Sequence, residues 1–179
     1  MKKLKEFNIP FKGLKEGKHH FEYHIDNSFF EHFEYEEFNA ANIKLVIEFN
    51  KKSTLLELYF EANGSINVNC DLTNEPYDQE ITSKFNLVVK FGEDYNDELE
   101  EILIIPHGEY QINVQQYIYE MIVLAKPAKC IHPGVKDGSL KSDILEKLKD
   151  YYIDSDNQKN VSEEIDPRWN KLKELLKDK

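Results

Sequence analysis

The chain of 179 residues is poor in cysteine, glycine and proline, with two, seven and six respectively, and it has no long apolar run. So little glycine and proline excludes a low-complexity or collagen-like chain. Two cysteines, Cys70 and Cys130, are too few for a disulfide framework or a four-thiolate zinc site, so we expect free thiols, at least one of them buried. The longest apolar stretch, 121–125, cannot span a bilayer, and the alternating start of the chain is not a secretory signal. We therefore expect a cytoplasmic protein with no membrane segment.

Acidic residues outnumber basic ones, 34 to 23, which gives a net charge of −11. The charge is uneven, because residues 1–18 carry +4, residues 19–135 carry −14 and residues 136–179 carry −1. An anionic body repels phosphate groups, so the charge argues against a broad nucleic-acid footprint and favours contact with protein. Eleven Phe and ten Tyr are too many for a disordered chain and indicate a folded core.

Alternation of apolar and polar residues predicts that the first half of the chain is mostly β-strand. Asn63-Gly64 is a strong turn signal between two such strands. A short helix is predicted over 28–34, where three phenylalanines have helical spacing, with a cap at Asn27-Ser28. Short connections between consecutive strands predict an antiparallel meander. The predicted strands are 19–25, 43–49, 56–60, 66–70 and 81–91.

The second half begins with an acidic loop over 92–101, followed by a short strand over 102–105 that Pro106 closes. The apolar period then changes from that of a strand to that of a helix. Asn113 is a suitable N-cap for this helix, and Pro127 prevents its continuation.

Apolar residues become sparse beyond residue 135. The pattern predicts an amphipathic helix over 140–151, a solvated linker over 154–164 and a terminal helix that starts with Asp166 as N-cap and Pro167 at its first position. The predicted fold class is α+β, an antiparallel, partly barrel-like β-sheet with a packed helix and a helical C-terminal extension. The predicted domains are a β-rich core over 1–135 and the helical extension with its linker over 136–179.

The candidate reactive residues form no recognisable catalytic or metal-binding pattern. His20 and His24 lie four positions apart on a predicted strand, roughly 13 Å, too far apart to share one ion. The acidic loop lacks the central glycine of a calcium loop. Cys70 could be a nucleophile with His107 or His132 as its base, but its inward phase on the strand favours a buried core thiol. We predict no enzyme, no catalytic residue, no metal site and no cofactor.

Two segments are candidates for partner binding. Phe7 and Phe11 lie among the N-terminal lysines, which include Lys3 and Lys5, a pattern found in nucleic-acid binding, although a solvated N-terminal strand is the simpler interpretation. The terminal helix places Trp169 beside Arg168, and these residue types often carry interface energy. Such a helix docks either on its own domain or on a partner, and the sequence leaves both open.

The order of several short motifs resembles the YceD family, a bacterial and plastid group linked to accumulation of large-subunit ribosomal RNA. The resemblance covers nearly the whole chain, and the terminal motif is its most specific part. The motifs are Val68-Asn-Cys70-Asp71-Leu-Thr73 at a strand end, Leu124-Ala-Lys-Pro127, Cys130-Ile-His-Pro133, and Asp166-Pro167-Arg168-Trp169 near the C-terminus.

The resemblance implies a non-enzymatic factor that supports large-subunit rRNA processing or accumulation, with a ribosomal or rRNA-processing protein, rRNA, or both as partners. It also implies that Asp166 caps the terminal helix, Arg168 makes a charge-assisted contact and Trp169 anchors the helix. Many members carry Cys-x-x-Cys in the first motif, where this chain has Thr73. A metal or redox role of paired thiols therefore does not carry over, while closeness of Cys70 to Cys130 stays open.

Two rival functions remain at this point. One is a small-molecule-binding protein or enzyme with a pocket in the β-sheet core, and the other is an interaction module outside ribosome biology. The sequence indicates neither the partner nor the oligomeric state.

Overall fold

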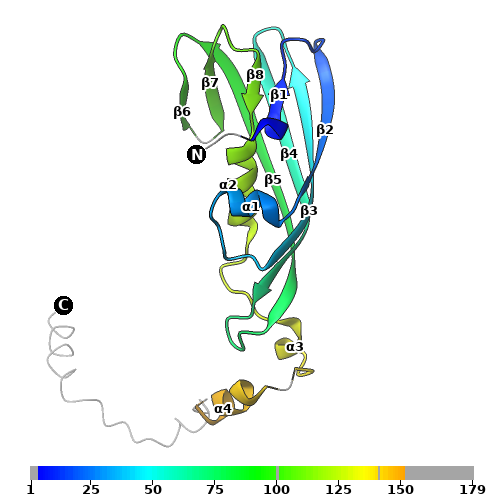
Figure 1. The fold of residues 1–179 in the computed structure, drawn as a ribbon, viewed down its shortest axis with the longest axis vertical. Helices are drawn as coiled ribbons and strands as arrows, with labels where there is room; N and C mark the ends of the chain where they lie inside the picture. Colours follow the sequence, from blue (N-terminus) through cyan, green and yellow to red (C-terminus); the bar gives the residue numbers. More distant parts are fainter. Residues whose placement is uncertain (1–3, 100, 141, 152–179) are drawn as a thin grey trace, which may run out of the picture. The chain divides into compact units, whose positions relative to one another are not determined.

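A computed structural model describes residues 4–99, 101–140 and 142–151 (Figure 1). The chain divides into two compact units, Met1–Ser139 and Leu140–Lys179. The first unit contains all the described strands. The second contains helix α4, Asp143–Tyr151, which lies within the helix predicted over 140–151.

Six strands form the main sheet of the first unit, in the order β2-β3-β4-β5-β7-β6. Strands β2 to β5 pair antiparallel with their neighbours in the chain, which confirms the predicted meander. β5 then pairs with β7 in parallel, and β6 pairs antiparallel with β7. The strands are β2 (Gly17–Ile25), β3 (Ala40–Lys51), β4 (Leu55–Asn69), β5 (Pro76–Gly92), β6 (Asn96–Leu99) and β7 (Ile102–Pro106).

The main sheet is not closed into a barrel, so the predicted partly barrel-like sheet is wrong. β2 and β6 form the two edges of the described sheet, whereas closure requires the edge strands to pair with each other. The apolar face is covered instead by α1, α2 and a second sheet of two strands, β1 (Asn8–Pro10) and β8 (Gln111–Asn113), all in front of the main sheet in Figure 1. Covering one face buries the apolar side chains without closure.

The predicted turn at Asn63-Gly64 is wrong, because both residues lie inside strand β4. This strand is unbroken over Leu55–Asn69, and both residues pair with β3 on one side and β5 on the other. The apolar residues keep one phase across Gly64, at even positions from Leu56 to Val68. A tight turn would reverse the chain, whereas an unbroken period of two is the pattern of one long strand.

Part of the acidic segment 92–101 is also strand, which corrects the prediction of a loop throughout. β6 pairs Asn96 with Ile104 and Leu99 with Ile102, with an irregular register between them. Its side chains are exposed or half-buried, so the strand has no apolar alternation. An edge strand of this kind is formed by backbone pairing alone.

Helix α1, Asn27–His32, follows the first part of the predicted 28–34 helix, but its cap is Asp26 and not Asn27-Ser28. The Asp26 carboxylate accepts a hydrogen bond from the Ser28 N–H at 2.9 Å. An extended residue just before the helix is the usual position for such a cap.

Helix α2, Gln115–Ala125, confirms the predicted helix that ends before Pro127. Val114 takes the N-cap position, one residue after the predicted Asn113. The Asn113 side chain still accepts a hydrogen bond from the Gln115 N–H, at 3.3 Å. A short helix, α3 (Pro133–Lys136), follows, and a 3₁₀ turn, η1 (Lys5–Phe7), precedes β1.

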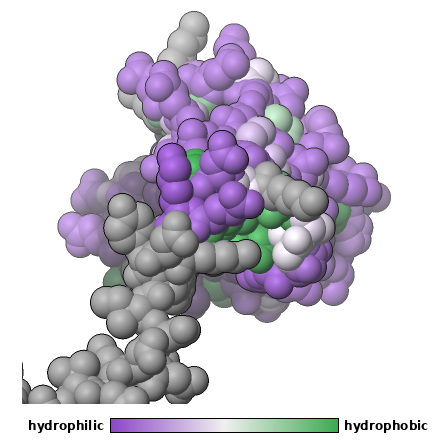
Figure 2. Space-filling view, turned by 90° about the horizontal axis from the view of Figure 1, so that it is seen from below, coloured by the Kyte–Doolittle hydropathy of each residue, from purple (hydrophilic) through white to green (hydrophobic). Residues whose placement is uncertain are grey.

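The core lies between the main sheet and the elements that cover one of its faces. Alternate side chains of β3, β4 and β5 point into it, with Phe49 and Phe60 among the largest, and α2 adds Ile118 and Ile122. The opposite face of the sheet carries polar and charged side chains, and the surface in Figure 2 is mostly hydrophilic with a smaller hydrophobic area. Among the described residues, no helix is long and apolar enough to cross a membrane.

Candidate functional site

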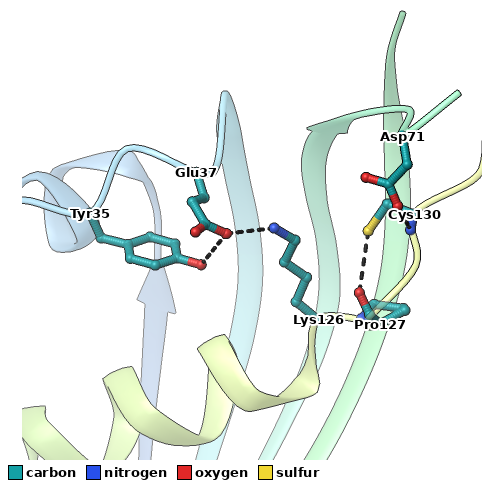
Figure 3. A network of polar contacts seen from close by, with 6 residues as sticks. All are labelled: Tyr35, Glu37, Asp71, Lys126, Pro127 and Cys130. Atoms are coloured by element: carbon teal, nitrogen blue, oxygen red, sulfur yellow. Dashed lines mark hydrogen bonds and ion pairs between the residues drawn. The ribbon is translucent and has the colours of Figure 1, made fainter. Parts of the chain in front are cut away.

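Motif residues that are distant in the sequence meet where β4 ends and where the chain continues beyond α2. The Asp71 N–H donates to the Cys130 carbonyl oxygen at 2.8 Å, and the Cys130 N–H donates to the Asp71 carboxylate at 2.6 Å (Figure 3). The Cys130 thiol donates to the Pro127 carbonyl oxygen at 3.5 Å. We call the meeting point of Cys70, Asp71, Pro127 and Cys130 the motif junction.

A tight turn between β4 and β5 presents Asp71 to its partner. The Cys70 N–H donates to the Glu75 carbonyl oxygen at 2.9 Å, and the Asn74 N–H donates to the Cys70 carbonyl oxygen at 2.8 Å. Asn74 has φ of 59°, a left-handed conformation that asparagine tolerates better than most residues. Thr73, the last residue of the first motif, is buried in this turn.

Both thiols of the motif junction are free and buried, which confirms the interpretation of Cys70 as a core thiol. Burial raises the pKa of the Cys70 thiol, but hydrogen bonds outweigh it and leave the pKa below its usual value. One of these bonds comes from the His132 backbone N–H, 3.3 Å from the Cys70 sulfur. Burial and then the Cys130 thiol raise the pKa of Tyr77, which lies beside them, to about 12.

The His132 ring is not placed as a base for Cys70. Its Nδ1 accepts the Gly134 N–H at 2.9 Å and so caps helix α3. His132 contacts the Cys70 sulfur through its backbone N–H. The motif junction therefore fastens the segment beyond α2 to the β4–β5 turn, and it shows no nucleophile–base pair.

We expect both cysteines to resist modification in the native full-length chain. With only 2% of each residue exposed, reaction with a thiol reagent such as DTNB requires local opening. In the native chain, we expect each thiol to react with DTNB at least about 100-fold more slowly than free cysteine does. In denaturant, we expect both thiols to react without delay. A native thiol that reacts at the free rate would contradict this arrangement, and Cys130→Ser identifies which thiol reacted.

A polar network next to the motif junction joins the end of α2 to the loop after α1 (Figure 3). The Lys126 ammonium lies 2.6 Å from the Glu37 carboxylate, which also accepts the Tyr35 hydroxyl at 3.1 Å. Lys126 holds the pKa of the Glu37 carboxyl below its usual range. Nearby, the rings of Phe33 and Tyr119 are stacked 4.2 Å apart. The network therefore links the C-terminal end of α2 to the loop that follows α1.

Tyr35 also belongs to the lining of an acidic hollow of about 390 Å³. Phe30 and Phe38, both buried, belong to its lining. Among the described residues that line it there is no lysine or arginine, so the hollow suits a cationic group and not a phosphate. Its carboxylates are Glu31, Glu34 and Glu36.

The predicted N-terminal nucleic-acid site loses its aromatic residues in the structure. Phe7 and Phe11 are buried in the core and cannot stack on bases. Lys5 is exposed on η1, and Lys18 pairs with Glu48 at 2.8 Å.

The other predicted binding residues lie outside the described residues: Lys3, Asp166, Pro167, Arg168 and Trp169. His20 and His24 lie exposed on strand β2, as expected. Among the residues that the structure describes, no group of three or more His, Cys, Asp or Glu could hold a metal ion.

Comparison with known proteins identifies a family. The family model described as "Large ribosomal RNA subunit accumulation protein YceD" matches residues 58–176, well over half of the chain. The matched range begins within β4 and includes all four residues of the motif junction. No curated protein and no solved structure matches the chain.

Proposed function

The chain belongs to the YceD family, and from that premise we propose that it is a non-enzymatic factor in the biogenesis of the large ribosomal subunit. It supports processing or accumulation of large-subunit rRNA in the cytoplasm by binding a ribosomal or rRNA-processing protein. The family match over residues 58–176 is the observation that carries this proposal.

The charge of the described surface supports a basic protein as the first contact. The body of the chain, residues 19–135, carries −14, and the acidic hollow has no basic residue among its described lining. Electrostatic attraction of this kind steers a basic partner to the surface and speeds association. The N-terminal lysines and the segment with Arg168 and Trp169, for which the sequence predicts a helix, are the parts of the chain that we propose for rRNA or for a second protein contact.

The rival proposal of a small-molecule pocket inside the sheet finds little support. The inward side chains of β3 and β4 fill the buried face, and Ile43, Leu45 and Leu58 are fully inaccessible. The acidic hollow is not an enclosed cavity, and its lining residues come from α1 and the loop after it, outside the sheet. A surface of this kind suits recognition of a protein better than enclosure of a substrate.

A pull-down of the tagged full-length chain, with and without nuclease, tests the choice of partner. We expect a large-subunit ribosomal protein or processing factor to remain bound after nuclease and to be released by salt, because salt screens charge attraction between surfaces. Recovery that nuclease abolishes would show that RNA bridges the contact. Recovery of no large-subunit component under either condition would contradict the proposed function.

A further inference from the structure

An apolar groove of about 360 Å³ runs along one side of helix α2. The α2 residues that line the groove are spaced three and four positions apart over two turns, so they lie along one side of the helix. β5 adds Phe85, and the segment before β7 adds Glu101. We call this surface the α2 groove; it is lined by Phe85, Glu101, Tyr117, Glu120, Met121 and Leu124.

The α2 groove has an unusual amount of exposed apolar surface. Leu124 is 83% exposed, more than any other large hydrophobic side chain in the described part of the chain. Met121, one turn earlier, is buried at the base of the same stripe, and the rings of Phe85 and Tyr117 stack 5.9 Å apart. An apolar patch bordered by charged residues is typical of a protein-binding surface.

The border of the α2 groove is acidic. Glu120 and Glu101 supply its charges, and the Gln116 amide holds the Glu120 carboxylate through a hydrogen bond of 2.7 Å. Burial, followed by the charges of Tyr95, Asp97 and Glu120, raises the pKa of Tyr117. No lysine or arginine is among the described residues that line the groove, so a basic occupant would meet unopposed negative charge.

The open face of the main sheet differs in this respect, because several of its acidic residues pair with lysines of the same face. Lys44 lies 3.1 Å from Glu22, and Lys84 lies 3.2 Å from Glu61. Its exposed aromatic side chain, Tyr59, is less exposed than Leu124. A face on which lysines lie beside the acidic residues attracts a basic partner less strongly, so it serves here as the control surface.

We propose that the α2 groove binds an amphipathic helix of a basic protein partner. The apolar side chains of that helix pack against Phe85, Met121 and Leu124, and its lysine or arginine side chains pair with Glu101 and Glu120. This is the helix-in-groove mode of recognition, in which apolar anchors at helical spacing supply affinity and charges fix orientation. The inference rests on the proposed function in that it assigns the protein contact of that function to one surface.

Binding of a defined peptide to the full-length chain tests the α2 groove directly. The probe is a fluorescein-labelled 14-residue peptide of leucine and lysine in helical repeat, followed by fluorescence anisotropy. We expect Leu124→Ser and Glu120→Lys each to weaken binding about 10-fold, as loss of a central interface residue does. Because Leu124 is exposed, Leu124→Ser should leave the melting temperature unchanged, which separates loss of binding from loss of folding.

Matched variants on the open sheet face control for general attraction between a basic peptide and an acidic protein. Tyr59→Ser removes an exposed apolar side chain from β4, and Glu80→Lys reverses an exposed charge on the same face of β5. Both variants should bind the peptide as the wild type does. Equal losses from these controls, or none from the groove variants, would overturn the proposal. So would equal affinity for a leucine–glutamate peptide, or displacement of the peptide from the groove by poly(U) RNA.

A cellular arm separates this inference from the proposed function. In cells depleted of the protein, the Glu80→Lys chain should restore large-subunit rRNA and the Leu124→Ser chain should not. If both restore it, the groove assignment fails while the function stands. If depletion has no effect on rRNA, the proposed function fails, and the peptide measurement alone decides whether the groove binds basic helices.

Discussion

Replacing Gly64 by alanine is expected to lower the free energy of unfolding by about 3 kcal/mol, the upper range for forcing an extra carbon into packed structure. Gly64 lies inside β4 opposite Ile43, where the two strands approach closely. A Cβ added to Gly64 would lie 2.7 Å from the Ile43 Cα and closer still to the Asn42 carbonyl oxygen. Both are backbone atoms, so no side chain can turn aside to make room. Urea denaturation of the wild type and the variant measures the difference.

The expected loss of stability in Gly64→Ala is opposite in sign to the usual effect of this replacement. Alanine in place of glycine inside an ordinary strand stabilises a protein slightly, because it restricts the unfolded chain. Gly13 is the matched control: an added Cβ there meets nothing within 4 Å, so Gly13→Ala should lie within about 0.5 kcal/mol of the wild type or be slightly stabilising. A neutral or stabilising Gly64→Ala would contradict the close approach of β3 and β4.

Truncation of Ile118 to alanine is expected to cost about 3 kcal/mol, whereas truncation of Leu124 should cost less than about 0.5 kcal/mol. Both residues lie on α2, but Ile118 is fully buried against the sheet and Leu124 is 83% exposed. The two changes remove side chains of equal size from one helix, so propensity differences are small. Urea denaturation of both variants measures the contrast.

This pair of variants shows whether α2 has one buried face and one free face. A large loss from Leu124→Ala would mean that Leu124 packs within the folded chain and is not available to a partner. A small loss from Ile118→Ala would mean that α2 does not cover the sheet. Either result would remove the structural basis of the α2 groove.

The long strands were predictable from the sequence, but the local turn signal at Asn63-Gly64 was misleading. The alternation of apolar and polar residues continues from Leu56 to Val68 without a change of phase, and this longer pattern indicates one strand. Glycine is needed there because β3 comes close, and nothing in β4 alone reveals that approach. The turn preference of Asn63-Gly64 conflicted with the strand alternation around it. The close approach of β3 decided in favour of one continuous strand.

Pairings between distant segments were beyond the reach of local patterns. β6 has no apolar face, and β7 pairs with β5 in parallel, so neither β6 nor the open form of the sheet could be derived from alternation. The N-terminal Phe7 and Phe11 looked available for stacking because the sequence does not show that β1 pairs with β8 and carries them into the core.

The sequence also revealed one of the two candidate sites better than the other. The motifs around Cys70 and Cys130 can be recognised from the sequence, and the structure shows that backbone hydrogen bonds and the Asp71 carboxylate join them. The α2 groove combines Phe85, Glu101 and the helix from three separate segments. The apolar period predicted a helix that ends before Pro127, but only the fold shows that Leu124 remains exposed beside Tyr117 and Met121.

We propose that this YceD family member supports large-subunit rRNA through the partners that it binds. The most direct measurement is the ratio of large- to small-subunit rRNA, together with large-subunit precursors, in cells from which the protein has been depleted. We predict that the ratio falls and the precursors accumulate, and that resupply of the wild-type chain reverses both. An unchanged ratio with no precursor accumulation after complete depletion would contradict the account.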